Sequence, residues 1–166
     1  DSGWTLNREI LDESFSRAKK DNVRVKVIVV INPANPTGAI LDRKSIMEII
    51  EFAGENEMVI FADEVYQDNL YGSEFLSFSK ALGDDINIPL FSFHSASKGF
   101  YGECGHRGGY FEVRNPPGAQ GSNKGFIDIL FKQASVNLCS NTIGQALIYL
   151  LSSPPPEGSE PYDQFN

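Results

Sequence analysis

One lysine in this sequence has the surroundings that covalent chemistry needs. Lys98 follows an apolar run, residues 89–94, and two small hydroxyl residues, Ser95 and Ser97. A lysine forms a Schiff base through its neutral amine, which burial and a nearby cation both favour. The two serines and Arg107 offer two hydroxyl donors and a forked cation, a combination suited to a phosphate. These residue types predict a lysine nucleophile beside a bound phosphate.

Two other polar clusters also follow apolar runs. Residues 32–38 read Asn-Pro-Ala-Asn-Pro-Thr-Gly, and residues 63–66 read Asp-Glu-Val-Tyr. Asp63 comes directly after Phe61 and Ala62, where a buried carboxylate is costly unless a cation pairs with it. A protonated pyridine nitrogen is such a cation, and the pairing would keep that ring an effective electron sink. Asp63 therefore predicts a binding position for a cationic ring.

Strands and helices alternate along the chain around these clusters. Apolar runs predict strands at 25–31, 58–62, 89–94 and 108–113. Apolar residues at helical spacing predict helices at 7–20, 42 to about 54, 74–82, around 124–136 and 143–151, with Asn7 and Asp42 as N-caps. The alternating order indicates a parallel sheet. We therefore expect an α/β fold with three layers, in which helices flank a mostly parallel sheet.

The same pattern describes the outer parts of this sheet. Residues 25–31 are almost continuously β-branched and apolar, which predicts a strand covered on both faces. Residues 108–113 predict a fourth strand, whose direction the pattern does not indicate.

The three polar clusters are expected to lie together. In an open parallel sheet, ligands bind outside the carboxyl ends of the strands, and each cluster follows a predicted strand. Taken singly, each has a simpler explanation. Asp63 suits a helix cap or a salt bridge, Lys98 and Arg107 suit surface charges, and the serines and residues 32–38 suit turns. The shared edge favours a binding site over these separate explanations.

Composition excludes several functional classes. With 166 residues, of which 41% are hydrophobic and 22% charged, the chain fits one soluble globular domain. Asp and Glu outnumber Lys and Arg by 22 to 14, which excludes nucleic acid as the expected partner. No apolar run approaches the roughly 20 residues that cross a bilayer, so we expect no membrane partner.

Metal and nucleotide chemistry also lack the residues that they need. Cys104 and Cys139 lie far apart, and with His94 and His106 they form no metal-binding pattern. Residues 58–64 resemble the strand that ends in Asp-Glu and binds magnesium in P-loop NTPases, but the chain has no Gly-x-x-x-x-Gly-Lys-Ser/Thr motif. We expect neither a metal site nor nucleotide hydrolysis.

Four motifs, in this order, resemble the large domain of fold type I aminotransferases, which use pyridoxal phosphate (PLP). They lie at residues 32–38, 62–66, 95–99 and 105–110. The resemblance covers most of the chain and implies that residues 1–152 are part of the PLP-binding large domain. Residues 153–166 are expected to be a linker toward a small domain beyond this chain.

The resemblance also implies a role for each residue of the expected site. Lys98 would carry the PLP and shuttle the proton of the substrate Cα. Asp63 would bind the pyridine nitrogen, while Asn35 and Tyr66 would hydrogen-bond the phenolic oxygen of the cofactor. The residues expected to hold the phosphate are Ser95, Ser97 and Arg107. The peptide bond before Pro36 is expected to be cis, as in this family.

Within the family, residues 63–69 and 102–110 look most like those of alanine aminotransferases. This resemblance implies exchange of an amino group between L-alanine and 2-oxoglutarate, giving pyruvate and L-glutamate. It also implies a homodimer in the cytoplasm or the mitochondrial matrix. A relative that acts on glyoxylate would share these motifs, so glutamate or alanine–glyoxylate exchange is an alternative.

Parts of the family's site have no counterpart in this chain. The glycine-rich turn for the phosphate and the ring-stacking aromatic are not seen before Asn32, and Trp4 is expected to be a packing residue. The arginine that binds the substrate carboxylate is expected beyond Asn166, and no targeting segment is seen. We therefore expect the isolated chain to be catalytically incompetent, with exposed apolar faces and unpaired sheet edges.

Overall fold

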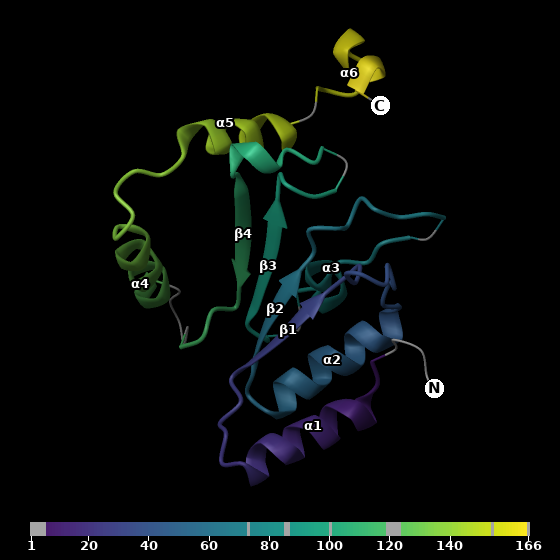
Figure 1. Ribbon diagram of the computed structural model, residues 1–166, viewed down its shortest axis with the longest axis vertical. Helices are drawn as coiled ribbons and strands as arrows, with labels where there is room; N and C mark the ends of the chain where they lie inside the picture. Colours follow the sequence, from purple (N-terminus) through teal and green to yellow (C-terminus); the bar gives the residue numbers. More distant parts are fainter. Residues whose placement is uncertain are drawn as a thin grey trace.

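A four-stranded sheet forms the centre of the molecule (Figure 1). The computed structural model describes residues 6–72, 74–84, 87–99, 101–118, 124–153 and 155–165. The strands, in spatial order, are β1 (Val27–Ile31), β2 (Val59–Asp63), β3 (Leu90–Ser95) and β4 (Gly109–Arg114). The first three are parallel, and β4 runs antiparallel to β3. The predicted mostly parallel α/β sheet is confirmed, and the direction of its fourth strand is now defined.

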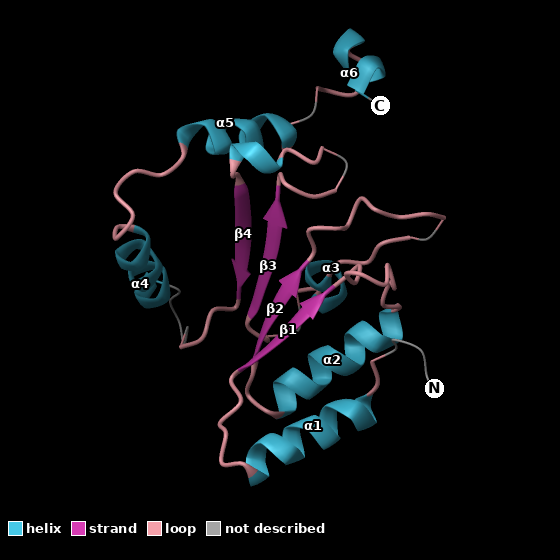
Figure 2. Ribbon diagram, in the orientation of Figure 1, coloured by secondary structure: helices cyan, strands magenta, loops and turns pink. Residues whose placement is uncertain are grey.

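Two long helices pack side by side, and one of them covers a face of this sheet (Figure 2). They are α1 (Arg8–Lys20) and α2 (Arg43–Glu55), and both predicted N-caps are confirmed. The Asn7 side chain accepts a hydrogen bond of 3.0 Å from the Ile10 amide. The Asp42 carboxylate accepts one of 2.8 Å from the Ser45 amide. Each cap satisfies an amide that the first helical turn leaves free, which fixes where the helix begins.

The hydrophobic core lies between α2, α3 (Phe78–Leu82) and one face of the sheet. The largest of its fully buried apolar side chains are Phe78, Ile46, Ile49, Ile50, Ile60, Leu82 and Leu90. Burying one such side chain stabilises the fold by about 1.5–3 kcal/mol. The core therefore fixes α2 and α3 to the three parallel strands whose ends carry the polar clusters.

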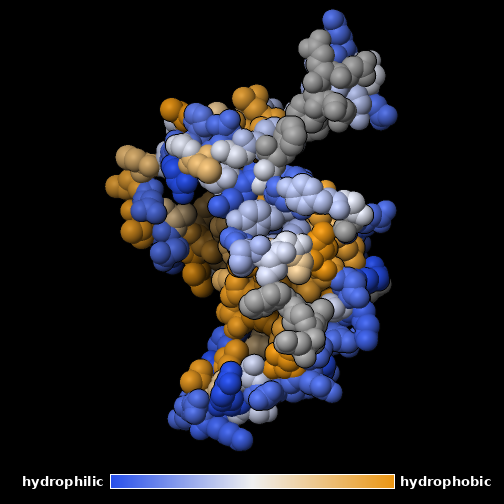
Figure 3. All heavy atoms as spheres, turned by 45° about the vertical axis from the view of Figure 1, so that its right-hand side comes forward, coloured by the Kyte–Doolittle hydropathy of each residue, from blue (hydrophilic) through white to orange (hydrophobic). Residues whose placement is uncertain are grey.

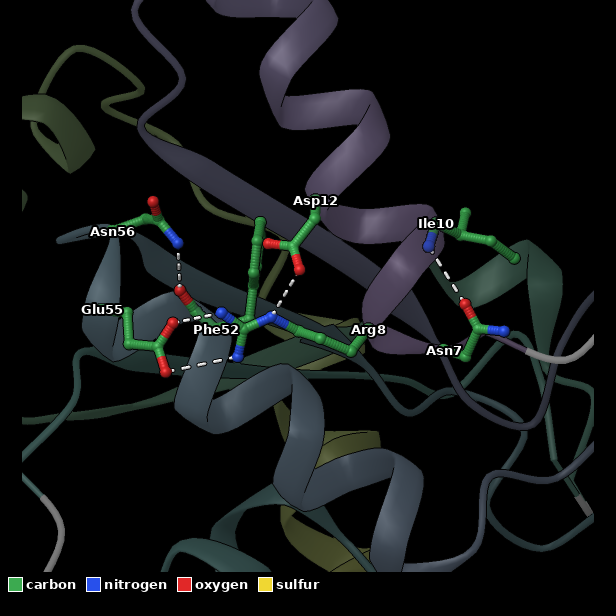
Figure 4. Close-up of polar contacts among 7 residues, drawn as sticks. All are labelled: Asn7, Arg8, Ile10, Asp12, Phe52, Glu55 and Asn56. Carbon is green, nitrogen blue, oxygen red and sulfur yellow. Dashed lines mark hydrogen bonds and ion pairs between the residues drawn. The ribbon is translucent and has the colours of Figure 1, made fainter.

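One arginine links α1 to α2 on the surface of this layer (Figure 4). The Arg8 guanidinium contacts both carboxylate oxygens of Glu55 and donates to Asp12 at 3.1 Å. It also lies over the Phe52 ring, 5.3 Å from the centroid. The hydrogen bond from Arg8 lowers the pKa of the exposed Glu55 carboxyl. Because these groups are exposed, the contact orients the two helices more than it stabilises them.

The other face of the sheet carries a row of phenylalanines. They are Phe61, Phe91, Phe93 and Phe111, with neighbouring ring centroids 5.1–6.5 Å apart. Phe126 of α4 (Lys124–Ala134) packs edge-on against Phe91, at 5.7 Å. On β1, however, Val29 is 65% and Ile31 42% exposed. The expectation that residues 25–31 are covered on both faces is therefore wrong, because these side chains stay open at the outer strand. Hydrophobic atoms also reach the surface in the middle of Figure 3.

The third helix is shorter than the helix predicted at 74–82. It begins after Ser77, whose hydroxyl accepts a hydrogen bond of 3.1 Å from the Lys80 amide. Phe75, which was expected on the inner face of the helix, is half-buried in the loop before it. The cap at Ser77 satisfies a free amide of the first turn, so the helix starts there.

The C-terminal part of the chain is helical. The predicted helices around 124–136 and at 143–151 are confirmed as α4 and α5 (Thr142–Leu151). Helix α5 contacts β4 and a short 3₁₀ helix, η1 (Cys104–His106). A further helix, α6 (Glu160–Phe165), stands apart beyond α5 (Figure 1). It lies within residues 153–166, for which a linker remains the prediction. Among the described residues, no helix has the length and apolar character to span a membrane.

Candidate active site

The carboxyl ends of the three parallel strands meet at one edge of the sheet. Ile31 pairs with Asp63, and Asp63 pairs with Phe93, so the strands end side by side. The Asn32 amide donates to the Asp63 carbonyl at 3.0 Å, which continues this alignment into the first loop. The prediction that the polar clusters share one edge is therefore confirmed.

Two predicted site residues from different loops are joined directly. The Asn35 side-chain amide donates a hydrogen bond of 3.1 Å to the Tyr66 phenol oxygen. Asn35 lies in the loop after β1, where the predicted cis peptide bond before Pro36 is confirmed and the bond before Pro33 is cis as well. Gly38 closes this loop with φ +69°, a conformation that side chains disfavour. The loop thus presents the Asn35 side chain to the loop after β2.

The three residues predicted to hold a phosphate also lie together. The Ser97 amide donates to the Ser95 hydroxyl oxygen at 3.0 Å, and Nη1 of Arg107 lies 3.5 Å from the Ser97 hydroxyl oxygen. The same Nη1 donates to the Cys104 carbonyl at 2.8 Å, which orients the guanidinium. The Cys104 thiol in turn donates to the Ser97 carbonyl at 3.2 Å. η1 and the turn after β3 therefore build one compact group around the arginine.

Lys98 lies between these two groups. It is exposed in the turn after β3, and its Nζ is 5.7 Å from the centroid of the Tyr66 ring. It makes no ion pair with any residue that the structure describes. Lys98 lines a pocket of about 110 Å³, while Asn35 and Tyr66 line a second pocket of about 230 Å³. The lysine amine is thus accessible beside the phenol.

The buried carboxylate of this edge is Glu64, not Asp63. Asp63 is half-buried, accepts only a long hydrogen bond of 3.4 Å from the Val65 amide, and has no ion-pair partner within the described ranges. Glu64 is 3% exposed, and burial raises the pKa of its carboxyl to about 7. The two residues differ because side chains alternate along a strand, and Glu64 shares the helix-covered face with Ala62. Alternation puts Asp63 and Glu64 on opposite faces, and only the packing of α2 and α3 decides which face is covered.

Sequence reasoning also missed a polar group behind Lys98. His94 of β3 and Tyr110 of β4 stack with ring centroids 5.2 Å apart, and both line the smaller pocket with Asp68. Burial lowers the pKa of His94 and raises the pKa of Tyr110. Only the antiparallel pairing of β3 with β4 brings these rings together. Within the described part of the chain, no three His, Cys, Asp or Glu side chains are grouped to hold a metal ion.

The chemistry of these donor groups is complementary to one kind of ligand. A guanidinium with two hydroxyls suits a phosphate, and an unpaired half-buried carboxylate suits a cationic ring nitrogen. An amide and a phenol at hydrogen-bonding distance suit a ring oxygen, and an accessible amine suits a carbonyl carbon. The residues present therefore fit a phosphorylated pyridine aldehyde.

Sequence comparisons relate almost the whole chain to known proteins. Residues 1–160 match the family model described as aminotransferase class I and II. The probable mitochondrial alanine aminotransferase of Dictyostelium discoideum is 40% identical over 172 residues, which cover 99% of this chain and 31% of that protein. Glutamate–glyoxylate aminotransferase 2 of Arabidopsis thaliana is 40% identical over 169 residues, covering 98% and 34%. The chain thus spans about a third of the length of these relatives.

Solved structures share the fold. The alanine aminotransferase of Pyrococcus furiosus is 32% identical with a TM-score of 0.64, covering 80% of this chain and 32% of its own. The tyrosine aminotransferase of Leishmania infantum is 25% identical with a TM-score of 0.67, covering 89% and 40%.

Proposed function

Because this chain belongs to the class I and II aminotransferase family, whose enzymes depend on PLP, we propose that the complete protein transfers an amino group between L-alanine and 2-oxoglutarate. The products are pyruvate and L-glutamate. The observation that carries this proposal is the meeting of Lys98, the Asn35–Tyr66 pair and the Arg107 group at one sheet edge. The similarity to alanine aminotransferases along 99% of the chain supports the choice of substrate.

Different polar groups of the chain would bind the phosphate and the ring of the cofactor. Ser95, Ser97 and Arg107, which contact one another beside η1, would hold the phosphate. Their hydrogen bonds to it would be charge-assisted, and such bonds are about twice as strong as neutral ones. Asp63 would pair with the ring nitrogen, and its half-buried setting would strengthen that attraction. When bound, PLP supplies an electron sink for the pair of electrons left at the substrate Cα.

Lys98 is the catalytic residue in this proposal. Its Nζ would hold the cofactor covalently. Once the substrate amine has taken its place, the freed Nζ would accept the proton from the substrate Cα and hold it for the return transfer. The Tyr66 ring centroid lies 5.7 Å from this Nζ, within the range of a cation–π contact. Asn35 fixes the Tyr66 phenol through its hydrogen bond, and both groups would hydrogen-bond the ring oxygen of the cofactor.

Substitution of the lysine tests this proposal. In the complete protein, Lys98→Ala should lower alanine turnover by a factor of about 10²–10⁴ or more, because proton transfer loses its base. Lys44→Ala, on the exposed surface of α2, is the matched control and should leave turnover unchanged. Normal turnover in the Lys98 variant would refute the proposal.

Chemical labelling gives a second test that does not depend on turnover. The protein is mixed with PLP, reduced with borohydride and digested for peptide mass spectrometry. A single stoichiometric label on Lys98 is expected. Labels scattered over Lys19, Lys20 and Lys44 would contradict a preformed site.

Exchange with glyoxylate is a second candidate function. The Arabidopsis glutamate–glyoxylate aminotransferase matches this chain at 40% identity, as the Dictyostelium alanine aminotransferase does. Comparing kcat/KM for glyoxylate and 2-oxoglutarate, with alanine and glutamate as donors, separates the two activities.

A homodimer remains part of the proposal. So does a location in the cytoplasm or the mitochondrial matrix, since several relatives are named as mitochondrial.

A further inference from the structure

One long loop, residues 65–77, lines both pockets of the candidate site. Tyr66 lies in the larger pocket, and Asp68 lies in the smaller one beside Lys98. The described residues of this loop, 65–72 and 74–77, contain no helix or strand. Ordering such a loop costs conformational entropy, about 1–2 kcal/mol for each fixed backbone residue. Contacts elsewhere in the molecule must therefore hold it in place.

Glu64 joins the two ends of this loop. Its Oε1 accepts a hydrogen bond of 2.8 Å from the amide of Phe78, the first residue of α3. Its own amide donates to the Phe93 carbonyl in β3 at 3.2 Å. Its carbonyl accepts a bond of 3.0 Å from the Gln67 amide. One residue thus ties the loop to β3, to α3 and to its own first turn.

The bond between Glu64 and Phe78 is shielded from water. Glu64 is 3% exposed and Phe78 is fully buried. A buried amide that loses its acceptor costs about 1–3 kcal/mol, so removal of the carboxyl group opens this junction. The helix itself keeps an independent cap, because Ser77 accepts from the Lys80 amide. The main effect of the Glu64 hydrogen bond is therefore to close the loop, since the helix has its own cap.

Among the described residues, the Glu64 side chain hydrogen-bonds to the backbone amide of Phe78 and not to Lys98 or Tyr66. Glu64 thus acts on the site only through the loop that it closes. Tyr66 stands two residues after Glu64, and the Asn69 amide donates to the Tyr66 carbonyl at 2.9 Å, so the hydrogen-bonded turn continues past Tyr66. The position of the phenol beside Asn35 follows from this turn.

We propose that Glu64 is a positioning residue that clasps the loop 65–77 and thereby holds Tyr66 at the cofactor site before PLP binds. This inference rests on the proposed function, since it gives Tyr66 a place at the cofactor. Its structural half, closure of the loop, is independent of any cofactor.

Hydrogen exchange of the complete protein without PLP tests the clasp. Amides of residues 65–77 should exchange at least about 10-fold faster in Glu64→Ala than in the wild type, because the loop opens locally. In Glu64→Gln the side-chain oxygen still accepts from Phe78, so exchange should stay within about 3-fold of the wild type. Glu51→Ala, on the exposed face of α2, is the matched control. Equal exchange in Glu64→Ala and the wild type would overturn the proposal.

Binding of PLP, followed by absorbance, tests the positioning. The dissociation constant should rise at least about 10-fold in Glu64→Ala and less than about 3-fold in Glu64→Gln. A loosened loop with unchanged PLP affinity would refute the positioning role, and so would equal losses in both variants. If Glu64→Ala does not fold, Glu64→Asp, one methylene shorter, replaces it with the same thresholds. If the wild type binds no PLP, the proposed function fails, and the exchange rates alone decide whether Glu64 clasps the loop.

Discussion

At the scale of single residues, backbone groups orient several side chains of the candidate site. Arg107 is oriented by the Cys104 carbonyl, and Glu64 by the Phe78 amide. Backbone partners are fixed by the fold, so they hold a side chain with little freedom. The site can therefore be formed before its ligand arrives.

Arg107 should matter for the phosphate of the cofactor and little else. Arg107→Gln removes the cation, and a hydrogen bond to a charged group contributes about 1.5–3 kcal/mol, which corresponds to a PLP affinity about 10–100-fold weaker. Pyridoxal, which lacks the phosphate, should bind both proteins alike. Absorbance titration measures both ligands, with Arg17→Gln on α1 as the control. An equal loss for pyridoxal would contradict the phosphate role.

Glu64 should make stability depend on pH near neutrality. Burial raises its pKa from 4.5 to about 7, while the nearby Glu112 charge acts in the same direction. The folded state therefore keeps the proton that the unfolded state loses, so stability falls as pH rises from about 4.5 to 7. The loss is on the order of 3 kcal/mol.

Urea unfolding of the complete protein at pH 5 and pH 8 measures this effect. Glu64→Gln should remove most of the difference, and Glu57→Gln, on an exposed turn, should not. An unchanged pH dependence in Glu64→Gln would show that the Glu64 proton is not responsible.

At the scale of the elements, α2 packs against the strands whose ends form the site and helps to hold them in position. It is capped by Asp42 and Asn56, and its inner face is buried against β2 and α3. A shift of this helix would move Asp63 and Glu64 together, because β2 follows it after three residues.

Ile49→Ala in α2 tests that packing. Ile49 is 1% exposed, so the change leaves a cavity, and we expect a loss of about 2–5 kcal/mol in the free energy of unfolding. Ile10→Ala in α1 is the control, because Ile10 is 40% exposed and should lose much less. The urea midpoints of the two variants give the comparison. Similar losses would mean that α2 is not the main packing element.

At the scale of the whole molecule, this chain leaves apolar surface open. Val29 on β1 and Leu138 after α4 are 65% and 89% exposed. Within the described residues, β1 pairs only with β2, so its other edge has free backbone groups. Open apolar surface and an unpaired strand edge both favour association of chains.

The isolated 166-residue chain should therefore aggregate or fold only in part, and it should not turn over alanine. Size-exclusion chromatography, thermal melting and an aminotransferase assay of this chain test the expectation. A monodisperse sample with a cooperative melt would contradict the first part. Turnover of alanine would contradict the second.

Short-range patterns in the sequence determined much of this protein. Both N-caps, Asn7 and Asp42, the three parallel strands and the edge that carries Lys98 were predicted correctly. Caps and periodicity depend on residues within one or two helical turns or along one strand, so the sequence holds the whole cause. The order of strands and helices then leaves one arrangement for the polar ends.

The tertiary structure alone decided what depends on distant segments. It made β4 antiparallel, which stacks Tyr110 on His94, and it left Val29 exposed on the outer strand. It also buried Glu64 in place of Asp63 and paired it with Phe78. Burial and pairing are sums over contacts between parts of the chain that a local pattern does not relate. The residue types of the site were therefore readable in the sequence, whereas their exposure and partners required the fold.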